Sequence, residues 1–214
     1  AGAAQEIGFD AVEIHGAHGY LIDQFFWEGA NKRADAWGGD FVQRTRFAAE
    51  IVKAIRARVG ADYPIIFRFS QWKQQDFTAR LAPTPDELAR FLEPLTEAGT
   101  DIYHCSTRRF WEPEFEGSTL NLAGWTKKLT GRPTITVGSV GLKGADFVQT
   151  FRTREDSEIG DLGELEARLE QGEFDLVAVG RALLADPHWA AKVREGRIRE
   201  LAPFSASTLA TQAP

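Results

Sequence analysis

Apolar runs of strand length alternate with helical patterns along this chain. Between the runs, apolar residues recur three and four positions apart, the spacing that places them on one face of a helix. The alternation predicts parallel strands joined by helices, because a helical crossover returns the chain to the same end of a sheet. The predicted strands are Ala11–His15, Pro64–Ser70, Asp101–Thr107, Pro133–Ser139 and Phe174–Gly180.

Helix signals stand between these strands. Gly60 is a typical C-terminal stop, whereas Thr84 and Pro85 suit the N-cap and the first position of a helix. The predicted helices are Phe41–Val59, a helix from Thr84 to a stop before Gly99, Leu162–Gln171 and Ala182–Glu195. Three segments without apolar periodicity are predicted as loops: Gln71–Ala82, Arg108–Ala123 and Arg152–Gly160.

Residues suited to chemistry stand at or just beyond the carboxyl ends of the strands. They are His15, Arg68, Ser106, Gly138 and Gly180. In a (β/α)8 barrel that face carries the active site. A doubly wound sheet binds ligands at the same edge, but no Gly-x-Gly-x-x-Gly follows a strand here. The sequence therefore favours an α/β TIM barrel, with one domain over residues 1–214.

The most informative segment runs from His15 through His18 to Tyr20, with Gly16 and Gly19 between these side chains. Neutral imidazoles donate hydrogen bonds and a phenol can release a proton, so the trio suits polarising and protonating a carbonyl compound. Two other interpretations stay open. The histidines could cap the strand, or they could bind a metal, although no third ligand stands at suitable spacing. We expect no metal.

The last two predicted strands end in Gly138-Ser139 and Gly180-Arg181. Glycine lets backbone N–H groups approach a phosphate closely, and an arginine adds a bidentate ion pair. Barrels often bind phosphate after their last two strands. Plain turn chemistry explains either glycine alone, but the two endings together favour a phosphate site.

Arg68 lies inside an apolar strand, where a guanidinium needs an acceptor. Two partners are open at this point: an ion pair with Glu13 on a neighbouring strand, or an electron-rich cofactor over the barrel mouth.

Composition narrows the class of protein. A net charge of −6 and a pI near 5.3 argue against a nucleic-acid partner. The single cysteine, Cys105, excludes an internal disulfide, and no apolar run has membrane-spanning length. We expect a cytoplasmic protein. The chain has no methionine and opens on what we interpret as the end of a helix, so we expect a fragment or a processed chain.

Together these residues resemble the old yellow enzyme family of FMN-dependent ene-reductases. The resemblance runs through almost the whole chain and corresponds to the later part of the family's barrel. The strand around Arg68 and the endings at Gly138 and Gly180-Arg181 recur in the expected order. The most specific portions are Gly8–Phe25, Asn31–Gly39 and Arg44–Phe47.

The resemblance implies a mechanism. In that family NAD(P)H reduces FMN, which then delivers a hydride to the C=C bond of an α,β-unsaturated carbonyl compound. The residues that match His15 and His18 hold the carbonyl oxygen, and the residue that matches Tyr20 supplies a proton. The match to Arg68 lies near the flavin ring. The matches to Gly138, Ser139, Gly180 and Arg181 hold the FMN phosphate.

The resemblance also implies an incomplete barrel, because only about five of the eight strands are expected and the N-terminal strands are absent. We therefore expect a homo-oligomer or a complementing N-terminal half-barrel, and doubtful activity for the isolated chain. Two alternatives remain: a flavin-free, phosphate-binding barrel lyase or isomerase, and a non-catalytic half-barrel.

Overall fold

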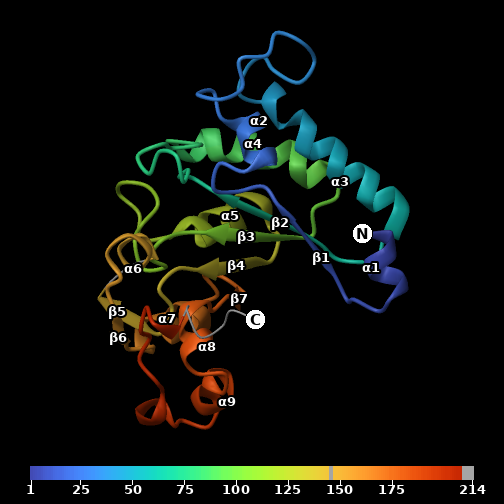
Figure 1. Cartoon of the computed structure of the whole chain (residues 1–214). Coiled ribbons are helices and arrows are strands. Elements are labelled where there is room, and N and C mark those ends of the chain that lie inside the picture. Colours follow the sequence, from blue (N-terminus) through green and yellow to red (C-terminus); the bar gives the residue numbers. More distant parts are fainter. Residues whose placement is uncertain (145–146, 209–214) are drawn as a thin grey trace.

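The fold is a parallel sheet with helices packed along it (Figure 1). The computed structural model describes residues 1–144 and 147–208. Its main sheet has the order β1-β2-β3-β4-β7, and every neighbouring pair is parallel, which confirms the predicted α/β fold. The strands are β1 (Val12–His15), β2 (Ile65–Ser70), β3 (Ile102–Ser106), β4 (Thr134–Val137) and β7 (Leu176–Val177).

Helices stand between these strands along the chain. A short antiparallel pair, β5 (Leu142–Gly144) and β6 (Ser157–Ile159), forms a second small sheet. Within the described residues, no helix is both long and apolar enough to cross a membrane. The α-helices are α1 (Gly2–Glu6), α2 (Leu21–Phe26), α3 (Arg46–Val59), α4 (Pro85–Glu97), α5 (Leu122–Thr130), α6 (Phe147–Thr153), α7 (Gly163–Glu170), α8 (Arg181–Ala185) and α9 (Trp189–Arg194), with 3-10 turns at Gln43–Thr45 and Ile198–Glu200.

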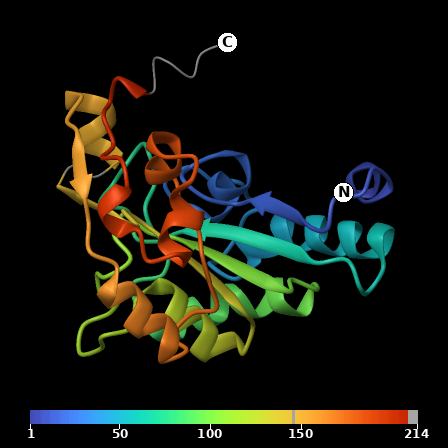
Figure 2. The same ribbon diagram turned by 90° about the horizontal axis from the view of Figure 1, so that it is seen from below.

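One face of the sheet forms the hydrophobic core. Alternate residues of β2, including Phe67 and Phe69, are fully buried, and Tyr103 of β3 lies edge-on to Phe69. Phe91 of α4 packs against the same cluster. Figure 2 shows helices α3, α4 and α5 along the outer side of the strands. This packing fixes which side chains turn to the other face, because a strand alternates its side chains.

The opposite face carries polar residues in register. His15 pairs with Arg68, and Arg68 pairs with His104, so three ionisable side chains stand in a row across β1, β2 and β3. Ser106 follows on the same face, two residues beyond His104. The sequence pattern had placed His15, Arg68 and Ser106 at strand ends, and the register brings them to one face of the sheet.

The helix from Thr84 is confirmed. Thr84 accepts a hydrogen bond from the N–H of Glu87, whose carboxylate accepts one from the N–H of Thr84, so the two form a capping box ahead of Pro85. The predicted helix Phe41–Val59 begins later, as α3, because the Asp40 carboxylate accepts from two successive N–H groups and forms a 3-10 entry turn instead.

The predicted helix Ala182–Glu195 is wrong as a single element. It is divided into α8 and α9 around Asp186, which has an extended backbone with φ −137° and ψ 96°. The cause is Pro187, whose ring disfavours helical geometry at the preceding residue. The Asp186 carboxylate then binds Lys192 of α9 at 2.6 Å and secures the break.

Two of the predicted loops contain regular structure. Helix α5 begins at the end of the Arg108–Ala123 segment, and β6 lies within Arg152–Gly160. The cap of α5 is readable from sequence in retrospect, because the Asn121 side chain accepts from the N–H of Gly124 and Gly131 ends the helix with φ 66°.

The capping box provides a stability test. Replacement of Thr84 by alanine leaves the first turn of α4 without its cap and should lower the free energy of unfolding by about 1 kcal/mol. Urea denaturation measures this change. Thr119→Ala is the control, since Thr119 is exposed and has no hydrogen bond among the described residues. Equal stabilities for the two variants would contradict the assignment.

Candidate active site

The loop after β1 holds its histidine in a strained but well-supported backbone. His18 has φ 64°, in the left-handed region that non-glycine residues seldom adopt, and Gly19 follows with φ 77°. The N–H of His18 donates to Ser70 Oγ at 2.9 Å, and the N–H of Gly19 donates to Asp23 Oδ2 at 2.7 Å. These bonds tie the loop to β2 and to α2.

A buried ion pair fixes this loop further. Lys73 Nζ lies 2.6 Å from Asp23 Oδ1, and both side chains are fully buried. Burial raises the pKa of Asp23 and lowers that of Lys73, and each partner's charge opposes those shifts. Sequence reasoning missed both residues. The only available signal was an aspartate within the mostly apolar Leu21–Phe26 stretch and a lysine in a predicted loop.

The structure brings the predicted trio of rings together. The ring centroids of His15 and His18 are 5.2 Å apart, and those of His15 and Tyr20 are 5.4 Å apart. Trp72, from the loop after β2, stacks on His18 at 4.6 Å and fixes the plane of that imidazole. Tyr20 is 52% exposed, so its hydroxyl can exchange protons with water.

Both histidines are neutral at physiological pH. Burial, followed by the positive charge of Arg68, lowers the pKa of His18 to about 3. The same two causes lower the pKa of His15. A neutral imidazole carries one N–H donor, so the pair can donate hydrogen bonds without being charged. Within the described residues, no group of three His, Cys, Asp or Glu side chains is arranged to hold a metal ion.

Arg68 does not form the ion pair that the sequence left open. Glu13 instead meets Nδ1 of His104 at 2.7 Å. The reason is the direction of the side chain. Arg68 donates to Ser106 Oγ at 3.4 Å, toward the carboxyl ends of the strands, whereas Glu13 lies two register pairs toward their amino ends. The Nε atom of Arg68 is buried and has no partner in the described structure. The Arg68 side chain also lines the cavity described below, so its guanidinium borders a space that a ligand can occupy.

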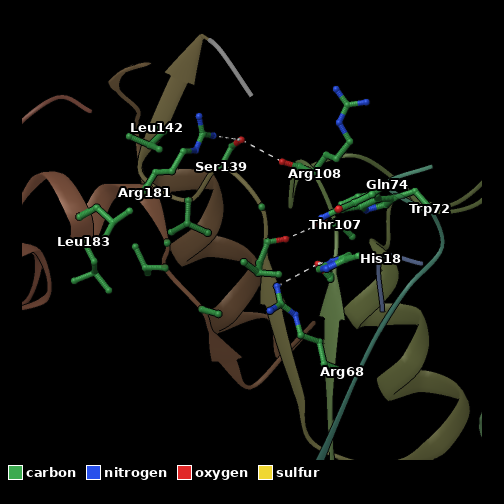
Figure 3. Close-up of a pocket in the computed structure, with 18 residues that line it drawn as sticks. His18, Arg68, Trp72, Gln74, Thr107, Arg108, Ser139, Leu142, Arg181 and Leu183 are labelled. Atoms are coloured by element: carbon green, nitrogen blue, oxygen red, sulfur yellow. Dashed lines mark hydrogen bonds between the residues drawn. The ribbon is translucent and has the colours of Figure 1, made fainter. Parts of the chain in front are cut away.

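A cavity of about 520 Å³ opens beside these residues. Figure 3 shows Arg181 and Ser139 at one side of it, with His18 and Arg68 at the other. This size lies within the range of about 300–1,000 Å³ that is typical of ligand pockets. His15 and Tyr20 are not among its lining residues; they lie beyond His18.

The Arg181 side of the cavity has the glycine turns that the sequence predicted. Gly138 has φ 137°, and a Cβ there would lie 2.8 Å from the backbone oxygen of Thr107, so only glycine fits. Ser139 follows with φ 51°. Arg181 donates to Thr150 Oγ1 at 2.7 Å and to Ser139 Oγ at 3.4 Å, which aims its guanidinium at the turn. Gly180 lines the same side.

The depressed pKa of His18 predicts an acid-dependent loss of stability. Between pH 6.5 and about 3 the unfolded chain holds a proton on this histidine and the folded chain does not, so the free energy of unfolding falls as the pH drops. His18→Gln removes that contribution and should flatten the decline, as measured by urea denaturation at several pH values. His188→Gln, at an exposed position, is the control. An equally steep decline in His18→Gln would refute the half-buried, neutral state of this histidine.

Comparison with known proteins identifies the family. The family model of the NADH:flavin oxidoreductase / NADH oxidase family matches residues 1–200. An NADH oxidase of Thermoanaerobacter brockii is 38% identical over 201 residues, which cover 90% of this chain and 27% of that protein. An NADPH dehydrogenase of Clostridium acetobutylicum is 32% identical, with coverage of 87% and 49%, and a putative 12-oxophytodienoate reductase 3 of Oryza sativa subsp. japonica is 35% identical, with coverage of 86% and 43%.

This chain thus spans between about a quarter and a half of the length of these relatives. The family is FMN-dependent and takes NADH or NADPH as its reductant. The family match extends over most of the chain and confirms the resemblance that the histidine loop indicated. The chain belongs to the NADH:flavin oxidoreductase / NADH oxidase family, the family of the old yellow enzymes.

Proposed function

We propose that this chain carries the carbonyl-binding site and much of the FMN site of an ene-reductase, an enzyme that reduces the C=C bond of α,β-unsaturated carbonyl compounds with NAD(P)H. The observation that carries the proposal is the pair of neutral imidazoles of His15 and His18, with Tyr20 beside them, next to a cavity lined by three arginines. Neutral donors and an exposed phenol suit a substrate that gains charge on oxygen and then a proton on carbon.

The residues that line the cavity fit FMN. Arg68 supplies a guanidinium with an unpartnered Nε atom, which suits an electron-rich ring. Arg181 and the Gly138-Ser139 turn, with Gly180 beside them, suit a phosphate, because the turn leaves no room for a Cβ and the guanidinium is aimed at it. When bound, FMN supplies the hydride for the reaction.

The residues of this chain would bind the substrate's carbonyl group and supply the proton. His15 and His18 donate hydrogen bonds to the carbonyl oxygen of the substrate and stabilise the negative charge that develops there. The Tyr20 hydroxyl delivers a proton to the α-carbon and recovers one from water, to which it is exposed. Trp72 keeps the imidazole of His18 in a fixed plane, so its donor is already oriented when substrate arrives.

The site calls for more strands than this sheet has. Strands β1 and β7 are its two edges, and large apolar side chains beside them are exposed, namely Ile7, Phe9 and Leu176. Unpaired edges and open apolar surface invite association with further strands. We therefore propose that complementing barrel strands, from an N-terminal half-barrel or in an oligomer, cover the polar face of the sheet and complete the FMN site.

A visible absorption spectrum tests this function. After incubation with FMN and removal of the excess, the chain alone should keep little yellow flavin, because its site is incomplete. When it is mixed with the N-terminal half-barrel of a full-length relative, it should keep FMN, bleach anaerobically with NAD(P)H and regain colour with an activated enone. Tight stoichiometric FMN binding by the chain alone would contradict the incomplete site. Absence of colour in both samples would favour the lyase, isomerase or non-catalytic alternatives.

A comparison of FMN with riboflavin, which lacks the phosphate, tests the phosphate assignment in the same assay. Arg181→Ala should weaken FMN binding about tenfold or more, since a charge-assisted hydrogen bond contributes about 1.5–3 kcal/mol, and should leave riboflavin binding unchanged. Arg132→Ala is the control. Arg132 is exposed and precedes the first residue of β4, whereas the Gly138-Ser139 turn follows its last residue. Equal losses for FMN and riboflavin would show that Arg181 does not hold the phosphate.

A further inference from the structure

Ser106 lies between the two functional groups of the cavity. Its hydroxyl oxygen is 2.7 Å from Nε2 of His18 and 3.4 Å from Nη2 of Arg68. The residue ends β3 on the polar face of the sheet and is 3% exposed. In the described structure these are the hydrogen bonds of its hydroxyl, so the direction of each can be worked out.

The direction follows from the donor inventory. A guanidinium has donors and no acceptor, so Ser106 Oγ must accept from Arg68. The hydroxyl has a single proton, and the acceptor within reach is Nε2 of His18. If Nε2 instead carried the proton, the buried hydroxyl would face two donors, and its own proton would have no acceptor among the described residues. A buried donor without a partner is costly, so this arrangement is disfavoured.

The remaining ring nitrogen is then defined. His18 is neutral, so it carries one ring proton, and with Nε2 accepting from Ser106 that proton lies on Nδ1. Nδ1 has no hydrogen-bond partner among the described residues and is absent from the buried unpartnered atoms, so a ligand can reach it. The opposite tautomer would present a lone pair at Nδ1, which would repel a carbonyl oxygen.

We propose that Ser106 is a positioning residue that fixes His18 as the Nδ1–H tautomer, so that His18 meets the substrate's carbonyl oxygen as a hydrogen-bond donor. The role toward substrate rests on the proposed function, whereas the tautomer itself does not. Because the same hydroxyl accepts from Arg68, the cation beside the cavity also orients the imidazole through Ser106. The stacked ring of Trp72 fixes the ring plane, and Ser106 sets which nitrogen carries the proton.

Long-range ¹H–¹⁵N spectra of the full chain at neutral pH test the proposal without any cofactor. Such spectra identify the protonated nitrogen of each imidazole, and His18 is assigned among the four histidines by the signals lost in His18→Gln. The expected result is a single Nδ1–H tautomer for His18. A predominant Nε2–H form, or an average of the two, would overturn the proposal before any serine variant is made.

Substitutions then separate positioning from packing. Ser106→Ala removes the donor to Nε2 and should convert the single tautomer to a mixture, whereas Ser106→Thr keeps a hydroxyl and should restore Nδ1–H. Thr107→Val is the control, because the neighbouring Thr107 hydroxyl donates to the carbonyl oxygen of Val137 and not to His18. An unchanged Nδ1–H tautomer in Ser106→Ala would refute the role. Failure of the chain to bind FMN even with the N-terminal half-barrel added would refute the proposed function and leave this result intact.

Discussion

The buried ion pair between Asp23 and Lys73 is the interaction on which the site depends. It joins the helix after β1 to the loop after β2 in a region without solvent exposure, where loss of one partner typically costs about 3–5 kcal/mol. Asp23 also accepts from the N–H of Gly19. The left-handed backbone of His18 therefore persists because Ser70 holds its N–H and Asp23 holds the N–H of Gly19, and strain of this kind is typical of functional loops.

The parallel register of β1, β2 and β3 places the polar residues of the site next to this loop. With the apolar residues of β2 buried against the helices, its alternate residues turn to the other face, so Arg68 stands between His15 and His104. Arg68 would repel a cationic imidazole beside it, and the lowered pKa values of His15 and His18 leave both of these rings neutral. Arg68 helps to keep them so, and it stays charged because a guanidinium holds its proton at physiological pH.

The sequence was most informative where the signal is local. The apolar runs located the strands, and Thr84 located the start of α4. Prediction from sequence failed where one residue overrides the helical apolar pattern, as Pro187 does inside the predicted helix Ala182–Glu195. At the site, the histidine loop was recognisable from residue types. The partner of Arg68 was not, because side-chain direction along a strand decides between Glu13 and Ser106, and the Asp23–Lys73 pair joins residues fifty positions apart.

The central claim is that this loop binds and protonates a carbonyl substrate. Its most direct test measures two steps separately in the complemented enzyme: reduction of the flavin by NAD(P)H and its reoxidation by an enone. In Tyr20→Phe, flavin reduction by NAD(P)H should proceed as in the parent protein, because the phenol takes no part in it. Reoxidation by an enone should slow by about 10²–10⁴-fold, the usual contribution of a positioned proton donor. Equal reoxidation rates for the two proteins would contradict the account.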